Sequence, residues 1–68
     1  MINASKLRGK LAEANMTQKD LATAMGISTN TLSRKISGKR DVTVGEVKKI
    51  CDLLGIFDDS EKINIFLQ

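Results

Sequence analysis

The sequence predicts an all-α fold, a compact bundle of about five short helices in a single domain that covers residues 1–68. Three observations favour this class. The chain has no proline and only two aromatic residues, while the good helix formers alanine, leucine, lysine and glutamate are well represented. Leucines and isoleucines recur at spacings of three and four residues. A helix-capping residue precedes each apolar segment, and glycine or asparagine follows most of them.

The first two expected helices each begin at a side chain that can accept a hydrogen bond from a free backbone N–H. Asn3 is such a cap for a helix from about Ala4 to Ala14, and Thr17 for a second helix that ends at Gly26. Asp20 stands three residues after Thr17, which predicts a capping box with aspartate in place of glutamate. The side chains expected to face the core are Leu7, Leu11, Ala14, Leu21, Ala22 and Met25.

The third and fourth helices show the same kind of start. Ser28 is the expected cap of a helix that ends near Gly38. Thr43 and Glu46 predict a capping box for a helix that ends at Gly55. The side chains expected to face inward are Leu32, Ile36, Val44, Val47, Ile50, Cys51 and Leu54.

A fifth short helix is expected after the segment FDDS, residues 57–60. Ile63, Phe66 and Leu67 fall on one face of this helix and Ile65 on another. A helix so close to the chain end frays unless it docks on something. We therefore expect these apolar side chains to complete the core or to contact a partner chain.

Composition excludes several classes of function. The single cysteine, Cys51, allows no internal disulfide, and a chain without histidine is not expected to hold zinc. No nucleophile stands beside a suitable base and no glycine-rich phosphate loop is present, so we expect neither an enzyme nor a bound cofactor, metal or small-molecule ligand. No apolar segment approaches the roughly 20 residues that span a bilayer, and no signal peptide is evident, which favours a cytoplasmic location without membrane contact.

Charge is distributed unevenly along the chain. Residues 1–40 carry eight cations and two anions, whereas residues 41–68 carry three cations and six anions. The segment 26–40, GISTNTLSRKISGKR, contains no acid at all. A basic front half favours contact with a polyanion, although on charge alone a chance fluctuation in a small chain is an equal explanation.

Two helices joined by a short turn at Gly26 have the layout of a helix-turn-helix. The segment 16–40, MTQKDLATAMGISTNTLSRKISGKR, resembles the helix-turn-helix of the Cro/repressor family of phage and bacterial regulators. The matching positions are Thr17, Gln18, Leu21, Ala22, Gly26, Ser28, Thr31, Leu32, Ser33, Arg34, Gly38, Lys39 and Arg40. The resemblance implies a lambda repressor-like five-helix domain over nearly the whole chain. It also implies a sequence-specific transcriptional regulator that binds double-stranded DNA.

The chain departs from the family pattern in its first and third helices. Family members often carry an arginine late in the first helix and a glutamate late in the third, and the two pair. The aligned residues here are Leu11 and Ile36, so we expect an apolar contact in place of the ion pair. Lys35 stands where the family has an apolar residue, and we expect its ammonium group to reach solvent or a DNA phosphate.

With Leu32 and Ile36 facing inward, the opposite face of the third helix would meet base edges in the major groove. Asn30 suits adenine and Arg34 suits guanine, although in an isolated helix both would be ordinary solvated residues. The expected base contacts are Thr29, Asn30, Ser33 and Arg34. The expected contacts to the DNA backbone, by resemblance and by charge, are Gln18, Lys19, Ser28, Thr31, Lys35, Lys39 and Arg40.

A homodimer is expected, because one helix-turn-helix covers about half of a pseudo-palindromic operator. The expected dimer surface comprises Phe57, Ile65, Phe66 and Leu67. The alternative function is a protein-interaction module of the antitoxin or anti-repressor type, in which the acid-free segment would meet an acidic partner. A Cro-like small regulator and the DNA-binding part of a larger repressor are both consistent with the sequence.

Overall fold

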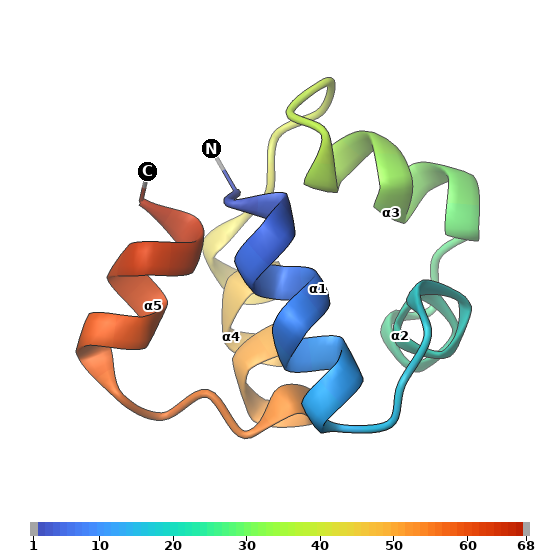
Figure 1. Ribbon diagram of the computed structural model, residues 1–68. Coiled ribbons are helices and arrows are strands. Elements are labelled where there is room, and N and C mark those ends of the chain that lie inside the picture. The colour runs from blue at the N-terminus through green and yellow to red at the C-terminus, as the bar shows by residue number, and fades with distance from the viewer. Residues whose placement is uncertain (1, 68) are drawn as a thin grey trace.

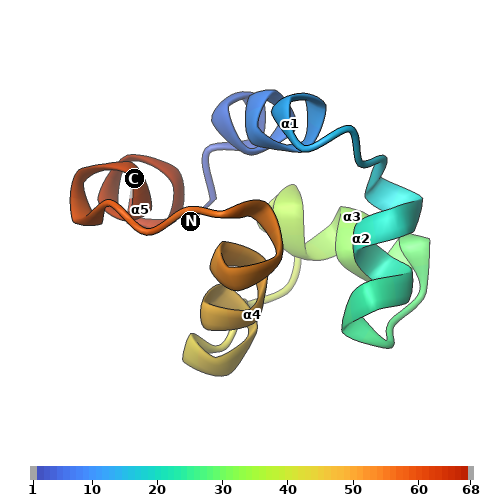
Figure 2. The same ribbon diagram turned by 90° about the horizontal axis from the view of Figure 1, so that it is seen from below.

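The computed structural model describes residues 2–67 and folds them into five α-helices without a β-strand. The helices are α1 (Ala4–Glu13), α2 (Gln18–Met25), α3 (Thr29–Ile36), α4 (Val44–Leu54) and α5 (Asp59–Phe66). In Figure 1, α1 crosses the middle of the molecule, with α5 on one side and α2 and α3 on the other. Figure 2 shows α5 and the α2–α3 pair at opposite ends of the molecule. The predicted all-α class and the five-helix layout are confirmed.

Side-chain caps define where the helices begin, as the sequence predicts. The Thr17 hydroxyl accepts the Asp20 N–H at 3.0 Å, and the Asp20 carboxylate accepts the Thr17 N–H at 2.9 Å. Thr43 and Glu46 form the same reciprocal pair, with distances of 3.1 and 2.9 Å. Because a helix leaves its first N–H groups without intrahelical partners, these bonds hold the starts of α2 and α4 in place.

Left-handed residues end two of the helices. Gly26 follows α2 with φ of 72°, and Gly55 follows α4 with φ of 68°. An L-residue with a Cβ adopts this conformation at a cost of about 1–2 kcal/mol, which glycine avoids. The two glycines therefore let the chain turn sharply after each helix, as the sequence predicts.

The hydrophobic core receives at least two side chains from each of the five helices. Its buried members are Ile2, Leu7, Leu11, Leu21, Ala22, Leu32, Ile36, Ile50, Cys51, Leu54, Ile56, Ile65 and Phe66. Within residues 2–67 no polar or charged residue is buried. Leu11 and Ile36 both belong to this core, which agrees with the expected apolar replacement of a polar pair. Cys51 is also buried as predicted, and its burial raises the pKa of the thiol.

The predicted inward faces are wrong at two places. In α5 the core-facing residues are Ile65 and Phe66, whereas Ile63 and Leu67 are 52% and 74% exposed. The Asn3 N–H donates to the Ile65 carbonyl at 2.6 Å, so the α5 backbone docks beside the start of α1 with Ile65 inward. Val44 was expected in the core but, as the first residue of α4, is 80% exposed, whereas Val42 and Val47 on either side of it pack against the core.

No helix in the described part of the chain is both long enough and apolar enough to cross a membrane.

Candidate nucleic-acid interface

Helices α2 and α3 pack against each other across the turn Gly26–Ser28. Ala22 is buried on the side of α2 that faces the core, and its carbonyl accepts the Ile27 N–H at 3.0 Å. The Ile27 side chain packs against the core from the turn. The Gly26 N–H also donates to the Thr23 carbonyl at 3.1 Å, so backbone bonds and one apolar contact hold the turn between the two helices.

The outward face of α3 carries polar side chains that are free to bind a ligand. Leu32 and Ile36 are 1% and 3% exposed, so the opposite face of the helix points to solvent. Asn30, Ser33 and Arg34 lie away from the core, and Thr29 is exposed in the first turn of the helix. Within residues 2–67 none of these four side chains makes a hydrogen bond or an ion pair. The four residues predicted to contact bases are therefore all accessible along α3.

A loop that carries two cations folds back on the last turn of α3. The Arg34 carbonyl accepts the N–H groups of Lys39 and Arg40 at 2.9 and 3.3 Å, and the Ser37 hydroxyl at 3.1 Å. The side chains of Arg34, Lys39 and Arg40 are exposed and make no ion pair within the described chain. Three cations are thereby held close to the polar face of α3, with no acid between residues 26 and 40.

The family model for the Cro/C1-type HTH DNA-binding domain matches residues 6–56, from within α1 to the residue after Gly55. The chain belongs to the Cro/C1-type helix-turn-helix DNA-binding domain family. This confirms the predicted family and makes the protein a regulator that binds double-stranded DNA. No curated protein sequence gives a significant match to the chain. Helix α5 lies beyond the residues that the family model covers.

In this Cro/C1-type domain the start of α2 offers a second polar surface. Gln18 is the first residue of α2 and is half-buried, whereas Lys19 beside it is exposed. The N-terminal end of a helix carries partial positive charge and directs N–H groups outward, which suits an anion such as a phosphate. The positions of Gln18 and Lys19 are therefore compatible with the expected contact to the DNA backbone.

The two hydroxyl residues at the start of α3 are not equivalent. The Ser28 hydroxyl accepts the Thr31 N–H at 3.0 Å and donates its own hydrogen to the Thr31 hydroxyl oxygen at 2.9 Å. Ser28 is therefore fully engaged as a helix cap. The Thr31 hydroxyl accepts that bond and keeps its hydrogen, so Thr31 is the one of the pair that can donate to a phosphate.

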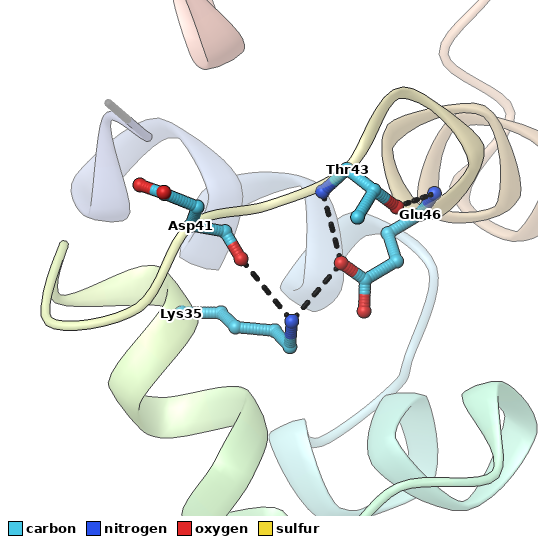
Figure 3. Close-up of polar contacts among 4 residues, drawn as sticks. All are labelled: Lys35, Asp41, Thr43 and Glu46. Atoms are coloured by element: carbon cyan, nitrogen blue, oxygen red, sulfur yellow. Dashed lines mark hydrogen bonds and ion pairs between the residues drawn. The ribbon is translucent and has the colours of Figure 1, made fainter.

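Lys35 does not lie where the sequence predicts. Its ammonium donates to Glu46 Oε1 at 3.0 Å and to the Asp41 carbonyl at 3.2 Å, as Figure 3 shows. Only 12% of the Lys35 side chain is exposed. The expectation that this ammonium reaches solvent is wrong, because an acid of α4 and a loop carbonyl accept its hydrogen bonds, whereas its contact with a DNA phosphate stays a prediction.

Sequence reasoning missed Glu46 as a partner of Lys35. The capping box with Thr43 accounted for this carboxylate, and no local pattern connects it to a lysine eleven residues earlier. One signal was present: a lysine at a family position that is usually apolar needs an acceptor nearby. The Thr43 N–H, followed by the Lys35 ammonium, holds the pKa of Glu46 below its ordinary value. The carboxylate is therefore charged at neutral pH.

The residues predicted to form a dimer surface do not lie on one face. Ile65 and Phe66 are core residues, while Phe57 and Leu67 are 71% and 74% exposed. Leu67 lines a groove of about 700 Å³ between α5, the start of α4 and the loop after α3, and Phe57 does not line it. The main apolar side chains along the groove are Val42, Val44, Val47, Ile63, Phe66 and Leu67.

Proposed function

We propose that the protein is a sequence-specific transcriptional regulator that binds a pseudo-palindromic operator as a homodimer, in the manner of the Cro-like and repressor-type regulators of phages and prophages. The observation that carries this proposal is the outward face of α3. Its polar side chains are exposed and lack partners within the described chain, although they stand beside a buried apolar stripe. A surface that hydrogen-bonds to base edges needs donors and acceptors that are exposed and not already bonded within the protein.

Each side chain on this face has a specific role in the proposal. Asn30 pairs with adenine and Arg34 with guanine, each through two hydrogen bonds, and Thr29 places its methyl group against thymine. Ser33 donates or accepts at a neighbouring base edge. A good bidentate contact contributes about 1–3 kcal/mol of discrimination against the wrong base. The proposed contacts to the DNA backbone come from Gln18, Lys19, Thr31, Lys39 and Arg40.

Selection of bound duplexes from a random DNA pool tests the proposal directly. We expect an enriched site with two inverted half-sites whose centres are about one helical turn, roughly 34 Å, apart. Binding should weaken by about 0.9 log units per log unit of salt for each phosphate contacted. Failure to enrich any sequence, together with no binding at low salt, would instead favour a protein-interaction module of the antitoxin or anti-repressor type.

The groove beside α5 is the proposed docking site for the second copy of the chain. Val44, Ile63 and Leu67 line it and are 80%, 52% and 74% exposed, so apolar side chains project from the same surface that is hollowed. A two-fold interface joins one surface to itself and therefore needs both projections and hollows. In a dimer joined through this groove, the three side chains would be removed from water, which favours association.

Charges of both signs lie along the groove, which suits a second copy of the same chain. Asp41 and Lys62 line it, and neither forms an ion pair within residues 2–67, while Arg40 at its edge is assigned to the DNA backbone. A two-fold axis brings the acid of one copy towards a cation of the other, so opposite charges can meet twice. Arg40 also belongs to the loop after α3, so docking here would place the DNA surfaces of both copies next to each other.

A further inference from the structure

We propose that Lys35 and Glu46 are positioning residues for DNA recognition, although neither touches DNA. Their ion pair holds the loop of residues 37–43 against the end of α3, and this sets where Lys39 and Arg40 stand relative to Arg34. The inference rests on the proposed function, because it concerns how the same DNA surface is given its shape.

The contact joins three parts of the fold at one oxygen atom. Glu46 Oε1 accepts the Lys35 ammonium from the last turn of α3 at 3.0 Å and the Thr43 N–H from the end of the loop at 2.9 Å. The same ammonium donates to the Asp41 carbonyl within the loop at 3.2 Å. Figure 3 shows Lys35 reaching from α3 to the strap of chain that leads into α4. Helix α3, the loop and α4 are therefore tied together by one lysine.

Polar bonds rather than packing hold this loop in place. Every residue from Ser37 to Asp41 is exposed, and Val42 is the one residue of residues 37–43 that packs against the core. At its beginning the loop is held by the Arg34 carbonyl, which accepts the N–H groups of Lys39 and Arg40. At its end the loop is held by Lys35, by Val42 on the core and by the capping box of Thr43 with Glu46. Loss of the ion pair removes the anchor that connects this end of the loop to α3.

The side chains of the pair are largely covered, so desolvation offsets part of what their attraction adds to stability. The side chains of Lys35 and Glu46 are 12% and 23% exposed, the lowest values of the three ion pairs in the described chain. A covered ion pair can often be replaced by apolar side chains with little loss of stability, because desolvation offsets much of the attraction. An apolar residue at position 35 would satisfy the fold. The lysine adds a hydrogen bond of fixed direction between α3 and the loop.

Two variants separate this inference from a direct contact of Lys35 with phosphate. Glu46→Gln removes the charge but keeps an oxygen that can cap Thr43, and Lys35→Met keeps the length of the side chain. If Lys35 served DNA by its charge, Glu46→Gln would weaken the hold on the ammonium, remove an acid near the phosphates and tighten binding. The positioning role gives the opposite sign: Glu46→Gln weakens binding to the selected duplex by about tenfold.

The double variant Lys35→Met/Glu46→Gln should bind no more weakly than either single variant, because both lose the same tie. The slope of binding against salt should change by the same amount in all three variants, because each displaces the same phosphate contacts of Lys39 and Arg40. Glu61→Gln is the matched control. It removes the charge attraction between Lys10 and Glu61, which have an N–O distance of 2.9 Å and join α1 to α5 without touching α3 or its loop. Its DNA affinity should equal that of the wild type.

Amide hydrogen exchange on the free protein tests the tie without DNA. Glu46→Gln and Lys35→Met should both speed exchange at Lys39 and Arg40 by about tenfold, while Glu61→Gln leaves these amides unchanged. Unchanged exchange in both variants overturns the inference, whether or not the wild type binds DNA. Faster exchange with unchanged or tighter DNA binding also overturns it. A wild type that binds no DNA, but whose loop loosens in these variants, contradicts the proposed function and leaves only a structural tie.

Discussion

Arg34 and Lys39 both present an unpaired cation beside α3, but their positions give them different tasks. Arg34 lies in the last turn of α3, on the exposed polar face, and its planar guanidinium can form two parallel hydrogen bonds to guanine. Lys39 lies in the loop, where its amide is bonded to the Arg34 carbonyl at 2.9 Å. Its ammonium is a point charge on a flexible stem, which suits a phosphate and carries no sequence information.

Alanine substitutions should separate these two tasks. Arg34→Ala should lower affinity for the selected duplex by about 1–3 kcal/mol and relax the preference at one base pair. Lys39→Ala should weaken binding to all sequences alike and reduce the salt slope by about 0.9, the value for one phosphate. Fluorescence anisotropy with selected and random duplexes over a salt series measures both effects. A uniform loss in both variants would contradict the assignment of Arg34 to a base.

Residue-level prediction from sequence succeeds where the signal is local. The exposed face of α3 follows from Leu32 and Ile36, whose spacing alone determines which side chains point away from the core. The partner of Lys35 could not be predicted in the same way. Its contact with Glu46 depends on how closely α3 and α4 approach, and that distance is set by the packing of the whole core rather than by neighbours in sequence.

At the scale of the helices, the starts and ends are predictable because each depends on one or two side chains. The two capping boxes form as expected, and the left-handed residues after α2 and α4 are the predicted glycines. The inward face of α5 is not predictable in this way. Its apolar residues at 63, 65, 66 and 67 offer two alternative faces, and only docking beside the start of α1 selects Ile65 and Phe66.

Two glycine substitutions of opposite effect test this account of the helices. Gly9 lies inside α1 with no heavy atom within 4 Å of an added Cβ, so Gly9→Ala should stabilise the fold by about 0.5–1 kcal/mol. Gly26→Ala also meets open space, but its φ of 72° is strained for alanine, and we expect a loss of about 1–2 kcal/mol. Urea denaturation followed by circular dichroism measures both. Equal effects of the two substitutions would show that backbone conformation does not control the turn after α2.

For the molecule as a whole, the capping carboxylates predict a loss of stability in acid. The Thr17 N–H lowers the pKa of Asp20, and the Thr43 N–H with Lys35 lowers the pKa of Glu46. A carboxyl whose pKa is lower in the folded state contributes its full stability above its ordinary pKa, about 3.9 for Asp and 4.3 for Glu, and loses it as pH falls through the lowered value. The free energy of unfolding should therefore fall below about pH 4.

The acid effect can be assigned to Glu46 by comparing variants. The difference in unfolding free energy between the wild type and Glu46→Gln should narrow as pH falls from about 7 to about 2.5. Protonation of Glu46 then removes from the wild type the negative charge that the variant already lacks. The side chain of Asp52 makes no hydrogen bond or ion pair with another residue in the range 2–67, and Asp52→Asn should keep the wild-type fall. A constant difference between the wild type and Glu46→Gln across this range would exclude Glu46 from the acid effect.

The arrangement of the whole molecule also predicts which surface joins two copies. The groove beside α5 borders the loop after α3. Phe57 is 71% exposed, close to the 80% of Val44, but lies outside the groove. Val44→Asp should abolish the dimer without unfolding the chain, because residue 44 is 80% exposed and begins α4, where an acid interacts favourably with the helix dipole. Phe57→Asp removes a side chain of similar exposure and should leave the dimer intact.

Sedimentation equilibrium of the free protein at high concentration measures both variants. The groove would be excluded by a Val44→Asp protein that still dimerises, and a dimer lost in Phe57→Asp alone would move the interface to the turn between α4 and α5.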